Sequence, residues 1–345
     1  MVETAPRYNA GIQRSKGLLE IAAALYDGSL SRRMTRSGTT TPQIDSRLGT
    51  RLSLRIDPRE GGAVDDGVGI SFAVNGFRDN ILQVARKEVA LLWINPNAPL
   101  ALAYKGKPPF AEPLPLRAVA VFPSWDATVI AVHESTGITS IEQIRERRYP
   151  LRVSTRDTIA PPFDEDTTMF AVNAIIAAAG FSLDDIRAWG GSIHPVSRPS
   201  HPDRSAAITK GTIDAIFDEG ILSWGQYAIE RGFRFLPIEA SLRQRVEAAG
   251  FDMVTVTKAR IPALKEPVVS MDFCGWPMIV HAEMPDDVAY ALAEAIETRK
   301  TLIPTDNYRP LDMAQLCSPD EETPRGAPLH PGAARFYRER GYLKR

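Results

Sequence analysis

Short apolar segments typical of buried strands alternate along this chain with longer segments whose apolar residues recur at helical spacing. Residues 52–56 alternate with period two, and residues 89–94 form a continuous apolar run typical of a strand buried on both faces. From Thr167 the apolar residues recur at helical spacing as far as Gly180, which is suited to ending a helix. Because such alternation favours parallel sheets covered by helices on both faces, the sequence predicts an α/β fold.

The same patterns place the remaining elements. Strands are predicted at residues 116–122, 128–132, 151–153, 215–217 and 233–238, the last taken as the final strand of its unit, and two extended stretches within 268–280. Helices are predicted at 9–26, from a capping signature at 139–142, from a second at 182–185, and from Asp286 to Pro304. Residues 61–69 and 190–204 are predicted to be loops, because both are rich in turn-forming residues.

Length, charge and cysteine content exclude several classes of protein. The 345 residues suit two lobes, and 41 basic against 42 acidic residues give a net charge of −1 without a basic patch for nucleic acid. No apolar stretch is long enough to predict a membrane-spanning helix. Cys274 and Cys317 are too few for a disulfide framework or a four-thiolate zinc site, and their pairing is left open. The expected partner is therefore a small molecule, and no cofactor is predicted.

The apolar run at residues 18–26 follows Arg14 and Lys16, an arrangement also found in signal peptides. Glu20 interrupts the run, and no small-residue cleavage site follows it closely. We therefore interpret this segment as a helix of the mature fold and expect no export signal in the chain.

No established catalytic motif is found: the chain lacks a phosphate-binding glycine loop, His-Glu-x-x-His, Cys-x-x-Cys and Gly-x-Ser-x-Gly. His194, His201 and Asp203 share one segment and carry side chains that can ligate a metal. The prolines between them stiffen that segment and do not by themselves bring the two imidazoles together. We interpret both as surface loop histidines and predict no metal site.

Several polar side chains come directly after predicted strands, where open α/β sheets bind ligands. Ser154, Thr155 and Arg156 follow one strand, and Arg156 is either a bidentate clamp for a ligand carboxylate or a solvated loop arginine. Asp218 and Glu219 follow another and either hydrogen-bond a ligand ammonium or hydroxyl group or cap a helix.

The predicted helix start at Thr167 and Thr168 has two interpretations. These residues and their backbone N–H groups can hold a ligand carboxylate. Alternatively, the acidic residues at 164–166, which end with Asp166, cap the helix and complement its dipole.

A second set of candidates is expected to face the same groove from the other lobe. Asn95 follows the apolar strand, and Ser124 and Trp125 lie in a proline-containing turn. Trp125 and Trp224 are candidates to cover an apolar part of the ligand, with core packing as the equal alternative.

Five segments in order give the chain a family resemblance. They are Asn75-Gly76-Phe77-Arg78-Asp79-Asn80 leading into the apolar strand, Gly137-Ile138-Thr139-Ser140-Ile141, Gly211-Thr212-Ile213-Asp214-Ala215, Met284-Pro285-Asp286-Asp287-Val288, and Leu329-His330-Pro331-Gly332-Ala333-Ala334-Arg335-Phe336-Tyr337. This series resembles TAXI-type substrate-binding proteins of TRAP transporters.

The resemblance implies a type II periplasmic-binding-protein fold: two lobes, a ligand cleft between them, and capture of a small organic carboxylate by hinge closure. Lobe one would comprise residues 1–127 and 268–345, and lobe two residues 128–267. Ser154 and Thr155 match the family's glycine-rich loop, Thr167 and Thr168 its helix start, and Asn95 and Trp125 its cleft positions in lobe one. The family is periplasmic and delivers its ligand to a TRAP-type membrane permease.

A different class of function stays open. The same scaffold can serve a cytoplasmic enzyme, for example a decarboxylase or lyase acting on an aromatic or hydroxy acid. Its acid and base candidates would be His194, Asp166 and Glu219.

Overall fold

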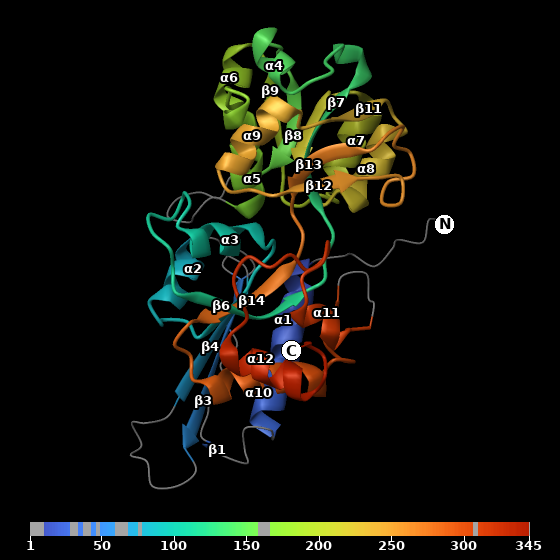
Figure 1. The fold of residues 1–345 in the computed structure, drawn as a ribbon. Helices are drawn as coiled ribbons and strands as arrows, with labels where there is room; N and C mark the ends of the chain where they lie inside the picture. The colour runs from blue at the N-terminus through green and yellow to red at the C-terminus, as the bar shows by residue number, and fades with distance from the viewer. Residues whose placement is uncertain are drawn as a thin grey trace, which may run out of the picture. The chain divides into compact units, whose positions relative to one another are not determined.

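The computed structural model describes residues 10–27, 34–36, 43–45, 49–58, 68–74, 78–157, 166–305 and 310–344. These residues form two compact units (Figure 1). Unit 1 is built from the described residues of 1–124 and from 274–344, and unit 2 from those of 125–273. The chain therefore leaves unit 1 after Ser124 and re-enters it at Cys274.

Unit 1 contains a sheet with strand order β1-β3-β4-β5-β14-β6, in which β2 pairs with β3. Strand β14, which comes from the returning chain, lies between β5 and β6 and is antiparallel to both. The strands are β1 (Met34–Arg36), β2 (Gln43–Asp45), β3 (Gly49–Pro58), β4 (Val68–Val74), β5 (Leu91–Trp93), β6 (Leu116–Phe122) and β14 (Trp276–His281).

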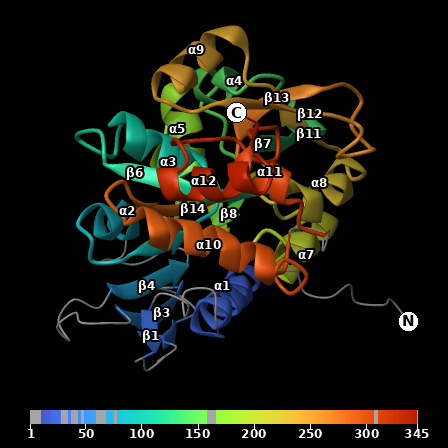
Figure 2. The ribbon, with the colours of Figure 1, turned by 60° about the horizontal axis from the view of Figure 1, so that its bottom comes forward.

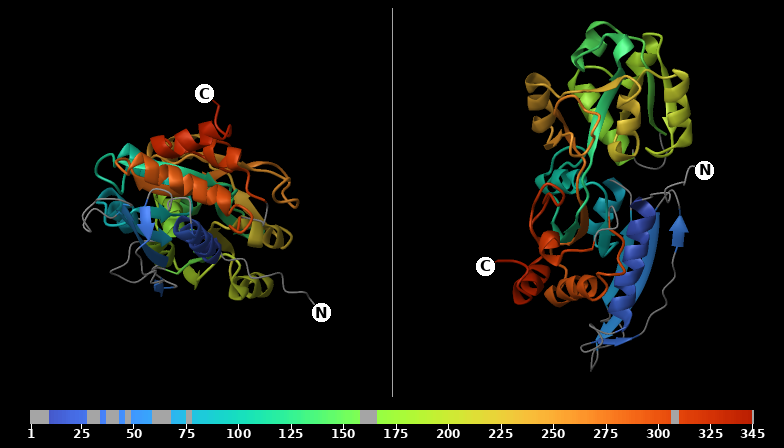
Figure 3. Two further views of the ribbon diagram at one scale, coloured as in Figure 1. Left: turned by 90° about the horizontal axis from the view of Figure 1, so that it is seen from below. Right: turned by 90° about the vertical axis from the view of Figure 1, so that its right-hand side faces the viewer.

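The described residues of unit 1 form the helices α1 (Ala10–Asp27), α2 (Arg78–Ala85), α3 (Ala98–Lys105), α10 (Asp286–Thr298), α11 (Met313–Cys317) and α12 (Pro331–Glu339). Helix α10 lies beside α1 and α12 (Figure 2), and α1 runs along β3 and β4 (Figure 3). The core under α1, α10 and α12 is apolar; its largest members include Trp93, Phe122, Trp276, Phe336 and Tyr337. Burial of the apolar faces of these three helices against the sheet holds them in place.

Unit 2 contains a second sheet with strand order β12-β13-β7-β10-β8-β9, in which β11 pairs with β7. Strands β8, β9 and β10 are parallel to one another, and β7 runs antiparallel to β10. The strands are β7 (Ala127–His133), β8 (Arg152–Arg156), β9 (Ser192–Val196), β10 (Ala215–Asp218), β11 (Phe233–Leu236), β12 (Met253–Val256) and β13 (Val268–Asp272).

The helices of unit 2 cover both faces of this sheet. Helices α5 and α9 lie on one side of the strands and α7 and α8 on the other (Figure 1). The helical segments are η3 (Glu134–Thr136), α4 (Glu142–Glu146), α5 (Thr167–Ala178), α6 (Leu183–Ala188), α7 (Pro202–Lys210), α8 (Ile221–Ile229) and α9 (Ala240–Ala248).

The predicted α/β class is confirmed, and so are the helix that begins at Thr167 and the capping signature at 182–185. Gly180 adopts a left-handed φ of 84° just after α5, which is the conformation expected of a glycine at a helix end. At the start of α6, Ser182 and Asp185 form both hydrogen bonds of a capping box.

The predicted loop at 190–204 is wrong, because it contains β9 and the first turn of α7. Strand β9 tolerates Pro195 because it is the edge strand of the sheet. Helix α7 begins at Pro202, in the first helical position that proline favours, and His201 caps it. Because proline and serine are frequent in this segment, the sequence pattern indicated a loop instead of these two elements.

Four further predictions need correction. Helix α4 begins after Ile141, and the side chain of Gln143 rather than Glu142 accepts from the Thr139 N–H group at 3.0 Å. Helix α10 ends at Thr298, before Pro304. Strand β11 is not the last of its unit, since β12 and β13 follow it. Residues 154–156 lie within β8 rather than after it.

Some predictions concern residues outside the described ranges. One is the predicted loop at 61–69, of which residues 61–67 lie outside; residues 68 and 69 belong to β4. Within the described residues, none of the helices combines the length and apolarity needed to cross a bilayer.

Candidate functional site

The carboxyl ends of β8 and β10 mark a switch point in the topology of unit 2. From β8 the chain proceeds to β9 on one side, and from β9 it returns past β8 to β10 on the other. Open α/β sheets bind ligands at such points, beyond the carboxyl ends of the strands. The side chains at this edge are therefore the natural candidates for a site.

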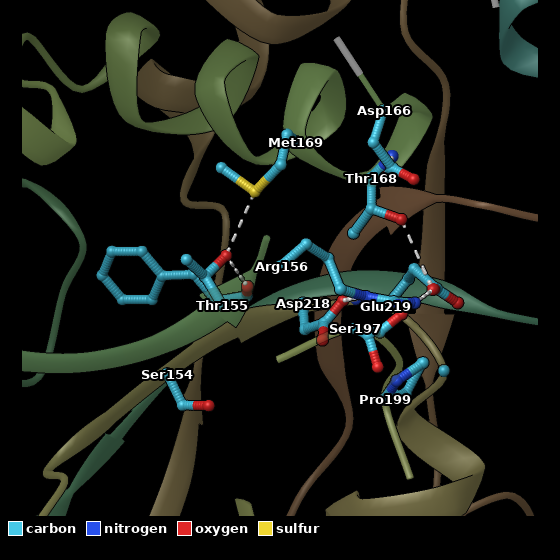
Figure 4. A network of polar contacts seen from close by, with 12 residues as sticks. Ser154, Thr155, Arg156, Asp166, Thr168, Met169, Ser197, Pro199, Asp218 and Glu219 are labelled. Atoms are coloured by element: carbon cyan, nitrogen blue, oxygen red, sulfur yellow. Dashed lines mark hydrogen bonds and ion pairs between the residues drawn. The ribbon is translucent and has the colours of Figure 1, made fainter. Parts of the chain in front are cut away.

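Neighbouring side chains of β8 point to opposite faces of the sheet (Figure 4). Thr155 lies on the side of α5, where its hydroxyl donates to the Phe217 carbonyl at 2.7 Å and contacts the Met169 sulfur at 3.3 Å. Because Thr155 is fully buried among these partners, it serves packing. Ser154 points to the other side, toward α7.

Arg156, at the end of β8, contacts three acceptors of the protein itself (Figure 4). Its Nε donates to Asp218 Oδ1 at 2.9 Å, its Nη1 to the Ser197 carbonyl at 3.1 Å, and its Nη2 to Glu219 Oε1. Burial lowers the pKa of Arg156, but the charges of Asp218 and Glu219 outweigh it and raise the pKa above its ordinary value. Arg156 thus donates one N–H group to each of two internal carboxylates, in place of the bidentate contact predicted with a ligand carboxylate.

Arg204, on α7, is a second guanidinium of this cluster, and sequence analysis missed it. Its Nη2 lies 2.5 Å from Asp218 Oδ2, its Nε donates to Ser154 Oγ at 3.1 Å, and its Nη1 donates to the Pro199 carbonyl at 3.1 Å. Arg204 is 1% exposed and Asp218 0%, so two guanidiniums share one buried carboxylate. The mistaken loop assignment hid this residue, because it placed Arg204 outside any helix.

The start of α5 completes the cluster. Asp166 caps the helix by accepting from the Thr168 N–H group at 2.7 Å, which confirms the capping interpretation for this residue. The Thr168 hydroxyl donates to Glu219 Oε1 at 3.4 Å, and Thr167 is partly exposed beside it. The acidic residues at 164 and 165 lie outside the described ranges.

Asp126 joins the cluster from the first residues of unit 2, and it too was missed. Its carboxyl group accepts from the N–H groups of Ala127 at 2.8 Å, Gly220 at 2.8 Å and Ile221 at 3.2 Å, so it caps α8 from another element. Burial raises its pKa well above the ordinary value, and the charge of Glu219 raises it further. The pKa of Glu219 is also raised by burial, against the opposing charge of Arg156.

The two candidate tryptophans both lie in unit 2 and are almost fully buried. Trp224 donates from Nε1 to the Glu219 carbonyl at 2.8 Å, and its ring lies 5.8 Å from that of Phe235. The Arg260 guanidinium lies 4.6 Å above the Trp125 ring. Both side chains therefore pack within unit 2, and Trp125 does not belong to the first lobe as expected, because the chain leaves unit 1 directly before it.

The remaining two candidates lie in unit 1. Ser124 is buried, and its backbone N–H donates to the Glu322 carbonyl at 3.0 Å while its carbonyl accepts from the Gly275 N–H at 2.9 Å. Asn95 follows β5 and is partly buried.

The proposed acid and base residues are spread over several elements. His194 lies on β9, where its Nε2 is 3.0 Å from the Ser192 hydroxyl, and the described contacts do not join it to Asp166 or Glu219. His201 instead caps α7 by accepting from the Asp203 N–H group. Across the described ranges, no group of three or more His, Cys, Asp or Glu side chains is arranged to hold a metal. Cys274 and Cys317 are both buried free thiols.

No protein-family model matches the chain. It resembles solved structures, among them the following three. An ABC transporter periplasmic binding protein from Brucella ovis with glutathione bound is 14% identical over 62% of this chain, with a TM-score of 0.27; the match spans 49% of that protein. A Xanthomonas citri protein bound to chloride is 15% identical, with coverages of 77% and 83% and a TM-score of 0.36. The L-cystine solute receptor of Neisseria gonorrhoeae is 12% identical, with coverages of 64% and 65% and a TM-score of 0.25.

Proposed function

We propose that this protein is a solute-binding protein of the TAXI/TRAP type, which captures a small organic carboxylate by hinge closure of its two units. The two chain connections, after Ser124 and after Phe273, would serve as the hinge. The protein would act in the periplasm and deliver its ligand to a TRAP-type membrane permease.

One observation carries this proposal: charged and hydroxyl side chains converge where β8 and β10 end. Arg156, Asp218 and Glu219 meet there from two parallel strands, and Thr168 joins them from the start of α5. Buried charges are costly unless they are paired, so a fold without a use for them is expected to fill such a position with apolar side chains. The order of the five family-like segments along the chain supports the same proposal.

Arg156 is the residue that we propose to meet the ligand carboxylate. A guanidinium has five N–H groups, and the three contacts described above leave two further donors for a ligand. Its side chain keeps 12% of its surface exposed, in contrast to that of Arg204, which is 1% exposed. The Asp218 carboxylate, which contacts both arginines, would hold the Arg156 guanidinium in place. Arg204 would in turn fix the position of that carboxylate.

Ser154 and Thr155 receive different roles in this proposal. Ser154 fixes Arg204 through its hydroxyl, and Thr155 packs against α5. Neither is proposed to touch the ligand. Thr167, which is partly exposed at the start of α5, would lie beside it.

A thermal-shift screen against small carboxylates, amino acids and aromatic acids tests the proposal, with every hit incubated and analysed for product. A ligand that binds only the folded protein raises its stability by RT ln(1 + [L]/Kd), so micromolar binders are visible at millimolar concentration. The proposal expects a stabilising acid that is recovered unchanged.

Two matched variants sharpen the screen. Arg156→Met is expected to weaken binding of any hit at least tenfold, whereas Arg152→Met, on the same strand but at its other end, is expected to leave affinity unchanged. Equal affinity in both variants contradicts the assignment of the site. Release of carbon dioxide or of another product favours an enzyme with His194, Asp166 and Glu219 as its acid and base candidates.

A further inference from the structure

Within unit 2, the Asp126 carboxyl group accepts from the N–H groups of Gly220 at 2.8 Å and Ile221 at 3.2 Å, the two residues directly after Glu219. This places it within hydrogen-bonding reach of the Glu219 carboxyl group. Two carboxylates have no hydrogen to share, so a hydrogen bond between them requires one proton. Glu219 is 8% exposed, and Asp126, which is partly exposed, is held in place by three backbone N–H donors.

Among the ion-paired groups beside this pair, the charges balance when the proton is present. Arg156 and Arg204 supply two positive charges, and Asp218 and Glu219 supply two negative charges in direct contact with them. A third carboxylate, ionised Asp126, would add a further negative charge beside Glu219. Burial and the charge of Glu219 both raise the pKa of Asp126. For Glu219, burial raises the pKa and the charge of Asp218 raises it further, whereas the charge of Arg156 and the hydrogen bond from Asp126 lower it.

Other charged groups lie near the pair on the neighbouring elements. They are Asp166 before α5, Arg260 against the Trp125 ring, and Asp272 on β13, whose backbone pairs with Ala127. The charge of Asp166 raises the pKa of Glu219, whereas the charge of Arg156 lowers it. The proton is therefore best assigned to the pair as a unit rather than to one residue.

We propose that Asp126 and Glu219 share one proton in the folded protein, and that this proton makes the charge of the unit 2 cluster respond to pH. The consequence for ligand capture rests on the proposed function: loss of the proton adds a negative charge beside Arg156 and disfavours an anionic ligand. The proton-sharing pair itself is independent of any ligand.

The effect on stability has a definite sign. In the unfolded chain, both carboxyl groups lose their protons near pH 4. The folded state retains one proton to higher pH, so it binds more protons than the unfolded state over that interval. The stabilisation from the pair is complete below pH 4 and is lost as pH rises through the pKa of the folded pair.

Asp126→Asn tests the inference, because an amide reproduces the hydrogen-bonding pattern of a protonated carboxyl group. Its oxygen can accept from the backbone, and its NH2 group can donate to Glu219. Unfolding of the ligand-free protein is measured from pH 4 to 9. The wild-type folding equilibrium constant is expected to fall relative to that of Asp126→Asn, by up to about tenfold per pH unit within the titration interval.

Asp184→Asn is the matched control, since the Asp184 side chain is 88% exposed and pairs only with Arg187 on its own helix among its described contacts. Its stability difference from wild type is expected to stay nearly constant with pH. A constant difference for Asp126→Asn as well would overturn the inference.

Infrared spectroscopy of the wild-type protein provides a readout that does not depend on the variant folding. A protonated carboxyl group has a C=O band distinct from the carboxylate bands. We expect such a band at neutral pH, its loss at high pH, its absence in Asp126→Asn, and its retention in Asp184→Asn. A wild-type spectrum without that band at neutral pH refutes the shared proton, whereas failure to find a ligand refutes only the proposed function.

Discussion

The two ends of one strand pair carry the same ion pair in different surroundings. At the amino end, Arg152 Nε donates to Asp214 Oδ2 at 2.9 Å, and at the carboxyl end Arg156 Nε donates to Asp218 Oδ1 at 2.9 Å. The side chains are 45% and 13% exposed in the first pair, but 12% and 0% exposed in the second.

The difference lies in what surrounds each pair. The Arg152–Asp214 pair is supplemented by backbone groups alone among its described contacts, namely the Arg152 N–H and the Gly211 carbonyl. The Arg156–Asp218 pair is joined by Arg204, Glu219 and Thr168. A single exposed pair is common on protein surfaces and contributes little, whereas a buried network is costly to desolvate. This difference supports the proposal that the carboxyl end binds a ligand.

Arg204→Met is expected to have the largest effect, because it leaves the fully buried Asp218 carboxylate with one cation instead of two. Removing one partner of a buried ion pair typically costs about 3–5 kcal/mol. The free energy of unfolding, measured by denaturant titration and located by hydrogen exchange in unit 2, checks this. A loss under about 1 kcal/mol would show that Asp218 does not depend on Arg204.

Arg156→Met is expected to destabilise the protein less, since Arg204 still neutralises Asp218. Loss of hydrogen bonds to charged partners costs about 1.5–3 kcal/mol. Ligand affinity is expected to fall more than stability does, because this side chain is the exposed member of the cluster. Full binding by a folded Arg156→Met protein would break the comparison.

Asp166→Ala removes the cap of α5 and is expected to cost about 1 kcal/mol. Ser182→Ala removes the cap of α6, away from the cluster, and is expected to cost a similar amount. Affinity for a ligand found in the screen is expected to change in the first variant only, because α5 begins at the cluster. Equal changes in both variants would point to a general effect of stability.

Arg152→Met is expected to have the smallest effect, about 0–1 kcal/mol, because its side chain is nearly half exposed. Denaturant titration alongside Arg156→Met makes the comparison direct. Equal losses at the two ends would contradict the distinction between them.

The sequence predicted the α/β class, the start of α5, and Arg156, Asp218, Glu219 and Thr168 as site candidates. These follow from local signals: period-two alternation, helical spacing, and polar residues at the ends of predicted strands. The positions brought together by β8 and β10 are 62 residues apart in the chain, so their pairing required a correct order of elements rather than a local motif.

Arg204 and Asp126 could not be predicted in this way. Arg204 enters the cluster because α7 packs on the sheet, and the sequence there reads as a proline-rich loop. Asp126 acts on α8, which begins 95 residues later in the chain, and this depends on antiparallel pairing of β7 with β10. For Trp125 and Trp224, side-chain type alone could not distinguish a ligand cover from packing, and burial decides for packing.

Hydrogen exchange of the protein with and without a stabilising ligand from the screen is the decisive test of the proposed site. We expect slower exchange in the peptides that contain the end of β8, the start of α5 and residues 218–221, with little change around Arg152. Slowing that spares all three segments, or that is as large at the amino end of β8 as at its carboxyl end, would contradict the assignment of the site.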